Sequence, residues 1–274
     1  MYREKALVIL ALVAIAAGGV FAEKTREGTG LDQSIQASLD PLGIQLVTKV
    51  YYRLPFIQQE GMLWESTKVE VGVQNSLSPA YDMMGAYLDI APIAIFDLAL
   101  TAQAIGYFNG LGFGFYDLSG YGAAFDSNAL NALPSKNSFG YLLTAAPTLK
   151  FAWGPLAMLD TFSMTYFSVD DGSGYFYERI NNVVLAKNDI ELQNQAYLLA
   201  TVFPGVLAGL NDAVLYVPAS GYVSHRLSAM GIYSTRLSDM VSINAILMVG
   251  TYFSDRYYQY GLYVAAQAGV SLAL

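Results

Sequence analysis

The single histidine of this chain, His225, stands among serines in the stretch YVSHRLSAM. A histidine beside a serine can act as its general base, with a third residue orienting the imidazole, as in hydrolases that cleave esters. Ser224 and Ser228 are the nearby hydroxyls, one and three residues away. On an extended strand, side chains an odd number of residues apart point to opposite faces. We therefore expect neither serine to pair with His225, and we expect no catalytic residues and no enzyme.

The sequence contains few residue patterns that could bind a metal ion or a cofactor. Asp170 and Asp171 precede Gly-Ser-Gly, but the stretch lacks the spaced carboxylates and the closing Glu of a calcium loop. The stretch GLGFGF at 110–115 lacks the Lys-Ser/Thr pair of a phosphate-binding loop. The chain has no cysteine, so it offers no disulfide and no cysteine ligands. We expect no metal and no cofactor.

A third group of polar residues alternates with apolar ones along extended segments. Its members are Gln45, Lys49, Arg53, Lys68, Glu70, Asp89, Asp97, Gln103 and Lys150. Both charge signs occur on neighbouring segments, so a cross-strand pair such as Lys49 with Glu70 is plausible. If these residues face the inside of a barrel, they either fill a narrow lumen as a polar network or line a small charged pore.

The elements that would position these residues are strands, because the pattern repeats every two residues. In GIQLVTKVYYRL, one face carries Ile44, Leu46 and Val50, and the other carries Gln45 and Lys49. The predicted strands are long enough to cross a bilayer when tilted, and their apolar faces are almost free of charge. This predicts an all-β, transmembrane, antiparallel up-and-down barrel, because a sheet in hydrocarbon must close. A secreted β-sandwich is the alternative.

We predict twelve strands, with ten as the alternative. They lie at 33–40, 43–54, 66–76, 83–90, 95–108, 140–151, 156–168, 191–203, 212–222, 225–235, 240–252 and 258–274. Tight turns are expected at Ile90–Ile93, Trp153–Pro155 and Thr235–Asp239, and long loops at about 109–138 and 169–190. Because outer-membrane barrels keep short turns on the periplasmic side, the even strand number places both ends there.

Composition and the first residues indicate export. The chain is 54% hydrophobic with a mean hydropathy of +0.38. Its one long apolar run, Ala6–Ala22, follows Arg3 and Lys5 and ends in a small-x-small pattern, which predicts a signal peptide at 1–22. An uncleaved anchor helix is the alternative. Removing two basic and one acidic residue from 14 and 22 leaves residues 23–274, the predicted barrel domain, at a net charge of −9. This charge argues against nucleic acid as a partner.

The last strand carries the most specific pattern. QAGVSLAL fits polar-x-Gly-x-x-apolar-x-apolar through Gln267, Gly269, Leu272 and Leu274. This resembles the C-terminal β-signal of Gram-negative outer-membrane barrels, although those strands usually finish in an aromatic residue. The resemblance implies a location in the cell outer membrane, with outer-membrane lipid and the barrel-assembly machinery as partners.

Several functions remain open for such a barrel. We expect a non-enzymatic role, either as a small pore for polar solutes or as a structural or surface barrel. The alternatives are surface binding or adhesion through the long loops, and a lipid hydrolase that uses His225.

Overall fold

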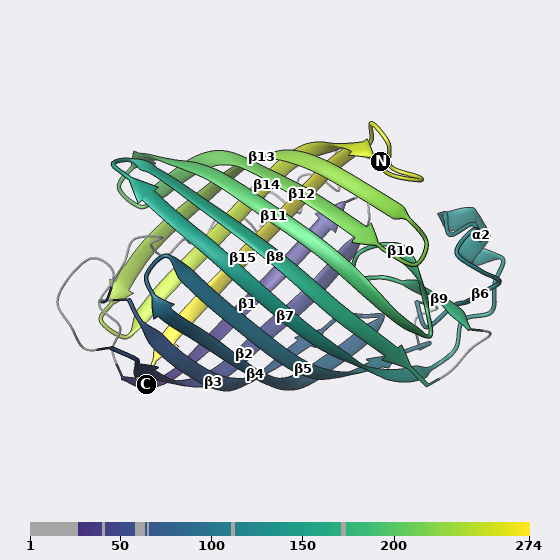
Figure 1. The fold of residues 1–274 in the computed structure, drawn as a ribbon, viewed down its shortest axis with the longest axis horizontal. Helices are drawn as coiled ribbons and strands as arrows, with labels where there is room; N and C mark the ends of the chain where they lie inside the picture. The colour runs from purple at the N-terminus through teal and green to yellow at the C-terminus, as the bar shows by residue number, and fades with distance from the viewer. Residues whose placement is uncertain (1–26, 40–41, 58–63, 65, 111–112, 171–173) are drawn as a thin grey trace.

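The computed structural model describes residues 27–39, 42–57, 64, 66–110, 113–170 and 174–274, and twelve of its strands form one closed barrel (Figure 1). These strands are β1 (Gly28–Leu39), β2 (Gly43–Pro55), β3 (Lys68–Leu77), β4 (Tyr81–Ile93), β5 (Phe96–Tyr107), β7 (Ser138–Trp153), β8 (Leu156–Val169), β11 (Asn188–Phe203), β12 (Val206–Val217), β13 (Tyr222–Ser238), β14 (Val241–Ser254) and β15 (Leu262–Ala273). The predicted all-β barrel of twelve strands is confirmed, and the alternatives of ten strands and of a sandwich are wrong.

The barrel is closed by the pairing of its first and last strands. β1 pairs antiparallel with β2 on one side and with β15 on the other, so that Ile35 lies opposite both Leu46 and Ala268. The remaining neighbours follow chain order around the ring. The ring therefore has no open edge, and its backbone amides find partners within the sheet.

The outer face of the ring is apolar and ends in aromatic residues. We call the end with the two long connections the loop end and the end with the two-residue turns the turn end. Exposed aromatic side chains at the loop end are Phe139, Tyr141, Tyr216 and Phe253, and those at the turn end are Phe151, Trp153, Phe203 and Tyr233. Aromatic girdles around an apolar band mark the two interfaces of a bilayer. The fold is thus a transmembrane barrel.

Three tight turns were predicted, and one of them is correct. The turn between β7 and β8 is Gly154–Pro155, where Gly154 adopts φ +57°. The turn expected at Ile90–Ile93 is wrong, because β4 continues to Ile93 and the chain reverses at 94–95. Pro92 has no N–H for the ladder and lies where the register shifts between Ile90 and Ile93.

The other turn errors also come from strands that begin or end beyond the predicted bounds. β13 runs to Ser238, so the turn expected at Thr235–Asp239 is only 239–240. The predicted strand 212–222 is wrong, because β12 spans Val206–Val217. Gly205 adopts φ +76° and makes a tight turn directly after β11. Pro218 then follows the end of β12.

The two long connections contain structure of their own. They hold β6 (Asp117–Leu118), β9 (Tyr175–Glu178), β10 (Val183–Ala186) and the short helix α2 (Ser127–Asn131), which lie together at the right-hand end of the barrel in Figure 1. The three strands form a separate sheet in the order β10-β9-β6. Asp126 caps α2 by accepting hydrogen bonds from the amides of Asn128 and Ala129. The loop end of the barrel therefore carries additional folded segments.

The predicted signal peptide at 1–22 lies outside the described residues. Among the residues that the structure describes, no helix has the length and apolar character needed to cross a membrane.

We predict that deletion of Gln267–Leu274 prevents assembly of the barrel. These residues are the partners of Gly30 to Gln36 on β1, so their loss leaves both strand edges open to hydrocarbon. The truncated protein should lose the folded, heat-modifiable band on a cold SDS gel. The substitution Leu274→Ala, which keeps the pairing, should retain it. A truncated protein that still shows the band would contradict this account of closure.

Candidate functional site: the lumen and its cap

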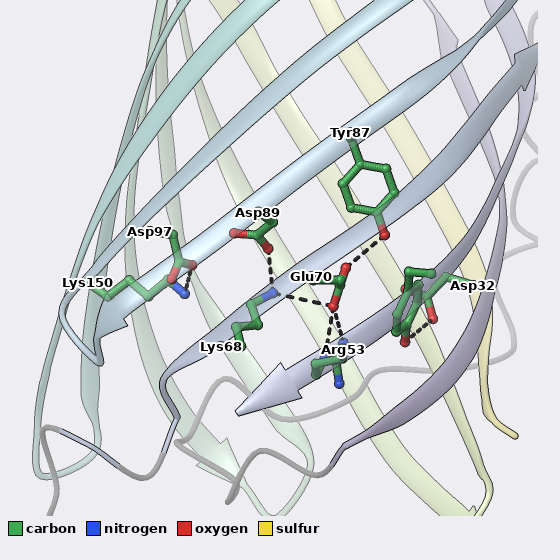
Figure 2. A network of polar contacts seen from close by, with 9 residues as sticks. Asp32, Arg53, Lys68, Glu70, Tyr87, Asp89, Asp97 and Lys150 are labelled. Carbon is green, nitrogen blue, oxygen red and sulfur yellow. Dashed lines mark hydrogen bonds and ion pairs between the residues drawn. The ribbon is translucent and has the colours of Figure 1, made fainter. Parts of the chain in front are cut away.

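A network of charged side chains lies on the inner face of strands β2 to β4, centred on the buried Glu70 (Figure 2). Arg53 donates through Nε and Nη2 to the same carboxylate oxygen, Oε2, at 2.7 Å each. The hydroxyl of Tyr87 donates to the other oxygen, Oε1, at 2.8 Å. Lys68 Nζ lies 3.7 Å from Oε2. One carboxylate thus compensates two cations of adjacent strands.

The network continues along the wall as further ion pairs. Lys68 pairs with Asp89, and Lys150 pairs with Asp97 (Figure 2). Since each buried charge lies beside an opposite one, the desolvation cost of placing it in the lumen is offset. These residues belong to the predicted lumenal set.

The predicted pair of Lys49 with Glu70 is wrong because of the strand register. β2 and β3 align so that Lys49 lies opposite Gln74 and Glu70 lies opposite Arg53. Lys49 Nζ instead lies 5.0 Å from the ring centroid of Tyr87, a cation–π distance.

The two predicted glutamines lie nearer the middle and the loop end. Gln45 donates to Gln36 at 2.6 Å and accepts from the hydroxyl of Tyr81 at 2.9 Å. Nε2 of Gln103 is buried, and among the described residues it has no hydrogen-bond partner. With these, the structure gives a position on the inner face to each of the nine predicted residues.

Sequence reasoning missed three inner-wall residues that complete the network, namely Asp32, Tyr51 and Tyr87. Tyr51 donates to Asp32 at 3.4 Å, and its ring centroid lies 4.9 Å from Cζ of Arg53. Strand parity could have found Tyr51, because it falls between Lys49 and Arg53 at the same two-residue spacing.

At the loop end, apolar side chains from the long connections pack into the lumen. Phe115, Phe176, Val183 and Leu185 are buried in one apolar core with inner-wall residues of β4, β5, β7, β8 and β12. The rings of Phe115 and Phe176 stack with centroids 5.2 Å apart. In the ring order, four strands separate β12 from β4, so this core reaches across the barrel. We call the assembly of β6, β9, β10 and α2 the cap.

A second apolar layer anchors the cap to the opposite wall. It contains Phe125, Leu130, Tyr177 and Val184, with Tyr257 of the β14–β15 connection packed against it. From that connection, Arg256 also donates to the carbonyl oxygens of residues 121 and 122 at 2.9 and 2.5 Å. The cap is therefore held from both sides of the barrel.

Two carboxylates are buried where the cap meets the barrel wall. Glu178 of β9 accepts from the amides of Ile180 and Asn181, both at 2.7 Å. The side chain of Asn181 donates to Oε1 of Glu191 at 2.7 Å, whereas the buried Oε2 of Glu191 has no hydrogen-bond partner among the described residues. Burial raises the pKa of Glu178 to about 7, against the two amide hydrogen bonds that favour its charged form. The cap thus contains a group that titrates near neutral pH.

A polar pocket lies between the cap and the wall of β11 to β14. Its lining includes Asn181, Gln193, Ser224, Arg226 and Asp255. These side chains offer both hydrogen-bond donors and acceptors and both charge signs, which suits a small polar group.

The structure separates His225 from its neighbouring serines. Ser224 and Ser228 are buried, and Ser224 donates to Asp255 at 2.8 Å. His225 faces outward, with Nε2 2.6 Å from Oδ1 of Asp212. The two serines therefore lie on the opposite face of β13 from His225.

The described residues contain no cluster of three or more His, Cys, Asp or Glu that could hold a metal ion. Asp170 is 92% exposed in its side chain and lies 3.9 Å from Lys187, while its predicted companion Asp171 is outside the described residues.

No family model and no curated protein matches the sequence. Solved structures give similarity at the level of shape. The translocator domain of the autotransporter NalP from Neisseria meningitidis is 10% identical, covers 100% of this chain and 95% of its own, and has a TM-score of 0.48. The transport unit of the autotransporter AIDA-I from Escherichia coli is 9% identical over 100% and 97%, with a TM-score of 0.47. The NanC porin is 8% identical over 89% and 100%, with a TM-score of 0.45. These values carry no functional argument, and the class of transmembrane β-barrel rests on the closed ring and its girdles.

We predict that Glu70→Ala destabilises the barrel by about 3–5 kcal/mol, because it leaves two cations without their shared partner. Urea unfolding in lipid vesicles would measure the change. Gln74→Ala, on the same face of β3, should cost less than about 1 kcal/mol. Equal losses for the two variants would show that the network adds nothing specific.

We also predict that the cap loosens as pH rises through neutrality. The folded cap binds the Glu178 proton more tightly than the unfolded chain does. The resulting stabilisation is full below the ordinary carboxyl pKa and is lost as pH rises through about 7. Hydrogen exchange at Val183–Leu185, corrected for intrinsic rates, should lose at least about tenfold of its protection between about pH 5 and pH 8. Glu178→Gln should remove this dependence, and Asp170→Asn, an exposed carboxylate in the same connection, should leave it. A flat profile for the unmodified protein would refute the assignment.

Proposed function

We propose that this chain is an outer-membrane barrel whose loop end faces outward and is closed by its own cap. In this state it is a surface barrel that presents folded loops and conducts no solute. The observation that carries the proposal is the apolar core of the cap, which reaches across the lumen from β4 to β12. Close-packed apolar side chains exclude water from the space that they occupy.

The charged wall supports the same proposal. Glu70, Asp89 and Asp97 each have a cationic partner, so this wall is a compensated network. A selective pore typically exposes charge of one sign at a constriction. The paired charges accordingly fit the first of the two predicted alternatives, in which these residues form a polar network in a narrow lumen.

A location in the outer membrane is part of the proposal. The apolar outer face and the two girdles support a bilayer environment, and a closed barrel is the β-structure that can span one. Outer-membrane lipid and the barrel-assembly machinery are then the partners that folding requires. An extracellular partner would meet the exposed side of the cap.

A small pore for polar solutes is the second candidate. It is favoured by the polar pocket beneath the cap, which would offer a solute both charge signs through Arg226 and Asp255. In that case the cap is a gate, and its movement would connect the pocket with the outside.

Conductance separates the two candidates. We predict that the unmodified protein in planar bilayers stays closed at all voltages. The double variant Val183→Asp with Leu185→Asp should conduct, because burying two carboxylates in the cap core costs several kcal/mol each and displaces the antiparallel pair β9–β10. Asn128→Asp, on the exposed side of α2, should stay closed.

Steps of conductance from the unmodified protein would overturn the closed-barrel proposal in favour of the gated pore. If the double variant is still folded on a cold gel but does not conduct, the apolar core of the cap is not what closes the barrel.

A further inference from the structure

The outer wall carries polar side chains where lipid would be expected. On β8, β11, β12 and β13, the outward positions include Asp160, Asn194, Asp212 and His225. Asn194 donates to Asp160 at 2.7 Å, and His225 pairs with Asp212, whose side chain is 48% exposed. Ionisable groups on a lipid face are costly, and such a group is a functional-site hypothesis by default. The His225–Asp212 pair therefore needs an account that the lumen and the cap do not supply.

A serine lies next to this pair on the neighbouring strand. Ser254 of β14 is the direct partner of His225 in the antiparallel ladder. Directly opposed residues project to the same face, with Cβ atoms about 4.5–5.5 Å apart. Ser254 is exposed, and Asp255 after it faces inward to Ser224, which places Ser254 on the outer wall. Asp212 contacts His225 diagonally, because the direct ladder partner of His225 on β12 is Val214. Asp212, His225 and Ser254 thus lie on three consecutive strands of the outer wall, in the order that acid, base and nucleophile require.

The local backbone supports a special position for Ser254. The register shifts between His225 and Arg226, which pair with Ser254 and Tyr252, so Phe253 has no partner of its own in the ladder. Bulges of this kind re-aim side chains and are frequent beside active sites. The hydroxyl of Ser254 donates to the carbonyl oxygen of Val223 at 3.4 Å, which is a long and weak hydrogen bond that a reacting group can replace.

The position of the site along the barrel axis, relative to the membrane interface, indicates the substrate. Phe253 of the loop-end girdle lies beside His225, with ring centroids 5.6 Å apart. Tyr216 of the same girdle is two residues from Val214, the ladder partner of His225. Aromatic girdles lie at the level where headgroups meet acyl chains. The ester carbonyls of membrane lipids lie at that level too.

We propose that Ser254, His225 and Asp212 form a catalytic site on the outer wall that hydrolyses acyl esters of lipids in the adjoining leaflet. Ser254 is the nucleophile, His225 the general base, and Asp212 the positioning residue that fixes the imidazole through Nε2. The sequence expectation of no enzyme considered Ser224 and Ser228, whereas the serine on the correct face lies on the next strand.

The reaction balances as an ordinary ester hydrolysis. Ser254 Oγ attacks the ester carbonyl carbon while its proton passes to Nδ1 of His225. The lipid alkoxide leaves with that proton, and the acyl group stays on Ser254 as an ester. Water then attacks the acyl group, gives its proton through His225 back to Ser254, and releases the fatty acid.

The test uses the full chain folded in mixed micelles, with a phospholipid in one arm and an acylated glycolipid in the other. Fatty acid should be released in one arm or both, which identifies the source of the ester. A fluorophosphonate probe should label Ser254, as located by mass spectrometry. Ser254→Ala and His225→Asn should each lower the rate by at least about 1000-fold and abolish labelling. Ser242→Ala, at the turn end of the same strand, should change neither.

The test of Asp212 uses kinetic measurements that would not change if Asp212 had only a structural role. Asp212→Asn should lower kcat by roughly 100-fold to 10,000-fold with little change in KM, and it should alter the pH profile of kcat/KM. Asp212→Glu should restore part of the rate.

Every variant is first checked for the folded band on a cold gel. If the folded unmodified protein neither releases fatty acid nor takes up the probe, the proposal is wrong. It is equally wrong if folded Ser254→Ala keeps the activity. Neither result bears on the cap, whose role is tested by conductance.

Discussion

Hydrocarbon offers no hydrogen-bond partner to a backbone amide, and this constraint explains the architecture of the barrel. The pairing of β1 with both β2 and β15 removes the two edges that a twelve-stranded sheet would otherwise expose. Closure then fixes an inside and an outside for every strand. Each side chain is committed to lipid or to the lumen by its parity alone, and a shift of register by one residue would reverse all of them.

Inside the ring, the same constraint explains the paired charges and the cap. Glu70 is buried on the inner wall, and its charge is compensated there by Arg53, Lys68 and the hydroxyl of Tyr87. At the loop end the connections have the length to fold back, and their apolar residues alternate across two layers. Val183 and Leu185 join the inner core, and Val184 joins the outer one. The folded loops thus place an apolar core across the loop end of the barrel.

On the outer face of the ring, polar side chains are uncommon, so each one calls for an explanation. Most outward positions are apolar, so the His225–Asp212 pair at the loop-end girdle stands out against its surroundings. The ladder brings Ser254 opposite His225 although they are 29 positions apart in the chain. The inner face of β13 bears Ser224 and Ser228, which explains why the local sequence directs attention to the wrong hydroxyls.

The sequence alone predicts the barrel, its twelve strands and the faces of residues such as Gln45 and Lys49, because the two-residue period is a local property of each strand. It misplaced β12 and two turns, since Gly205 and Pro92 act through backbone geometry that a hydrophobic pattern does not record. The fold, and not the sequence, reveals that Glu70 pairs with Arg53, that the long loops pack into the loop end of the lumen, and that Ser254 lies opposite His225. Each of these depends on register between strands and on contacts between distant segments, and no single stretch of the chain contains that information.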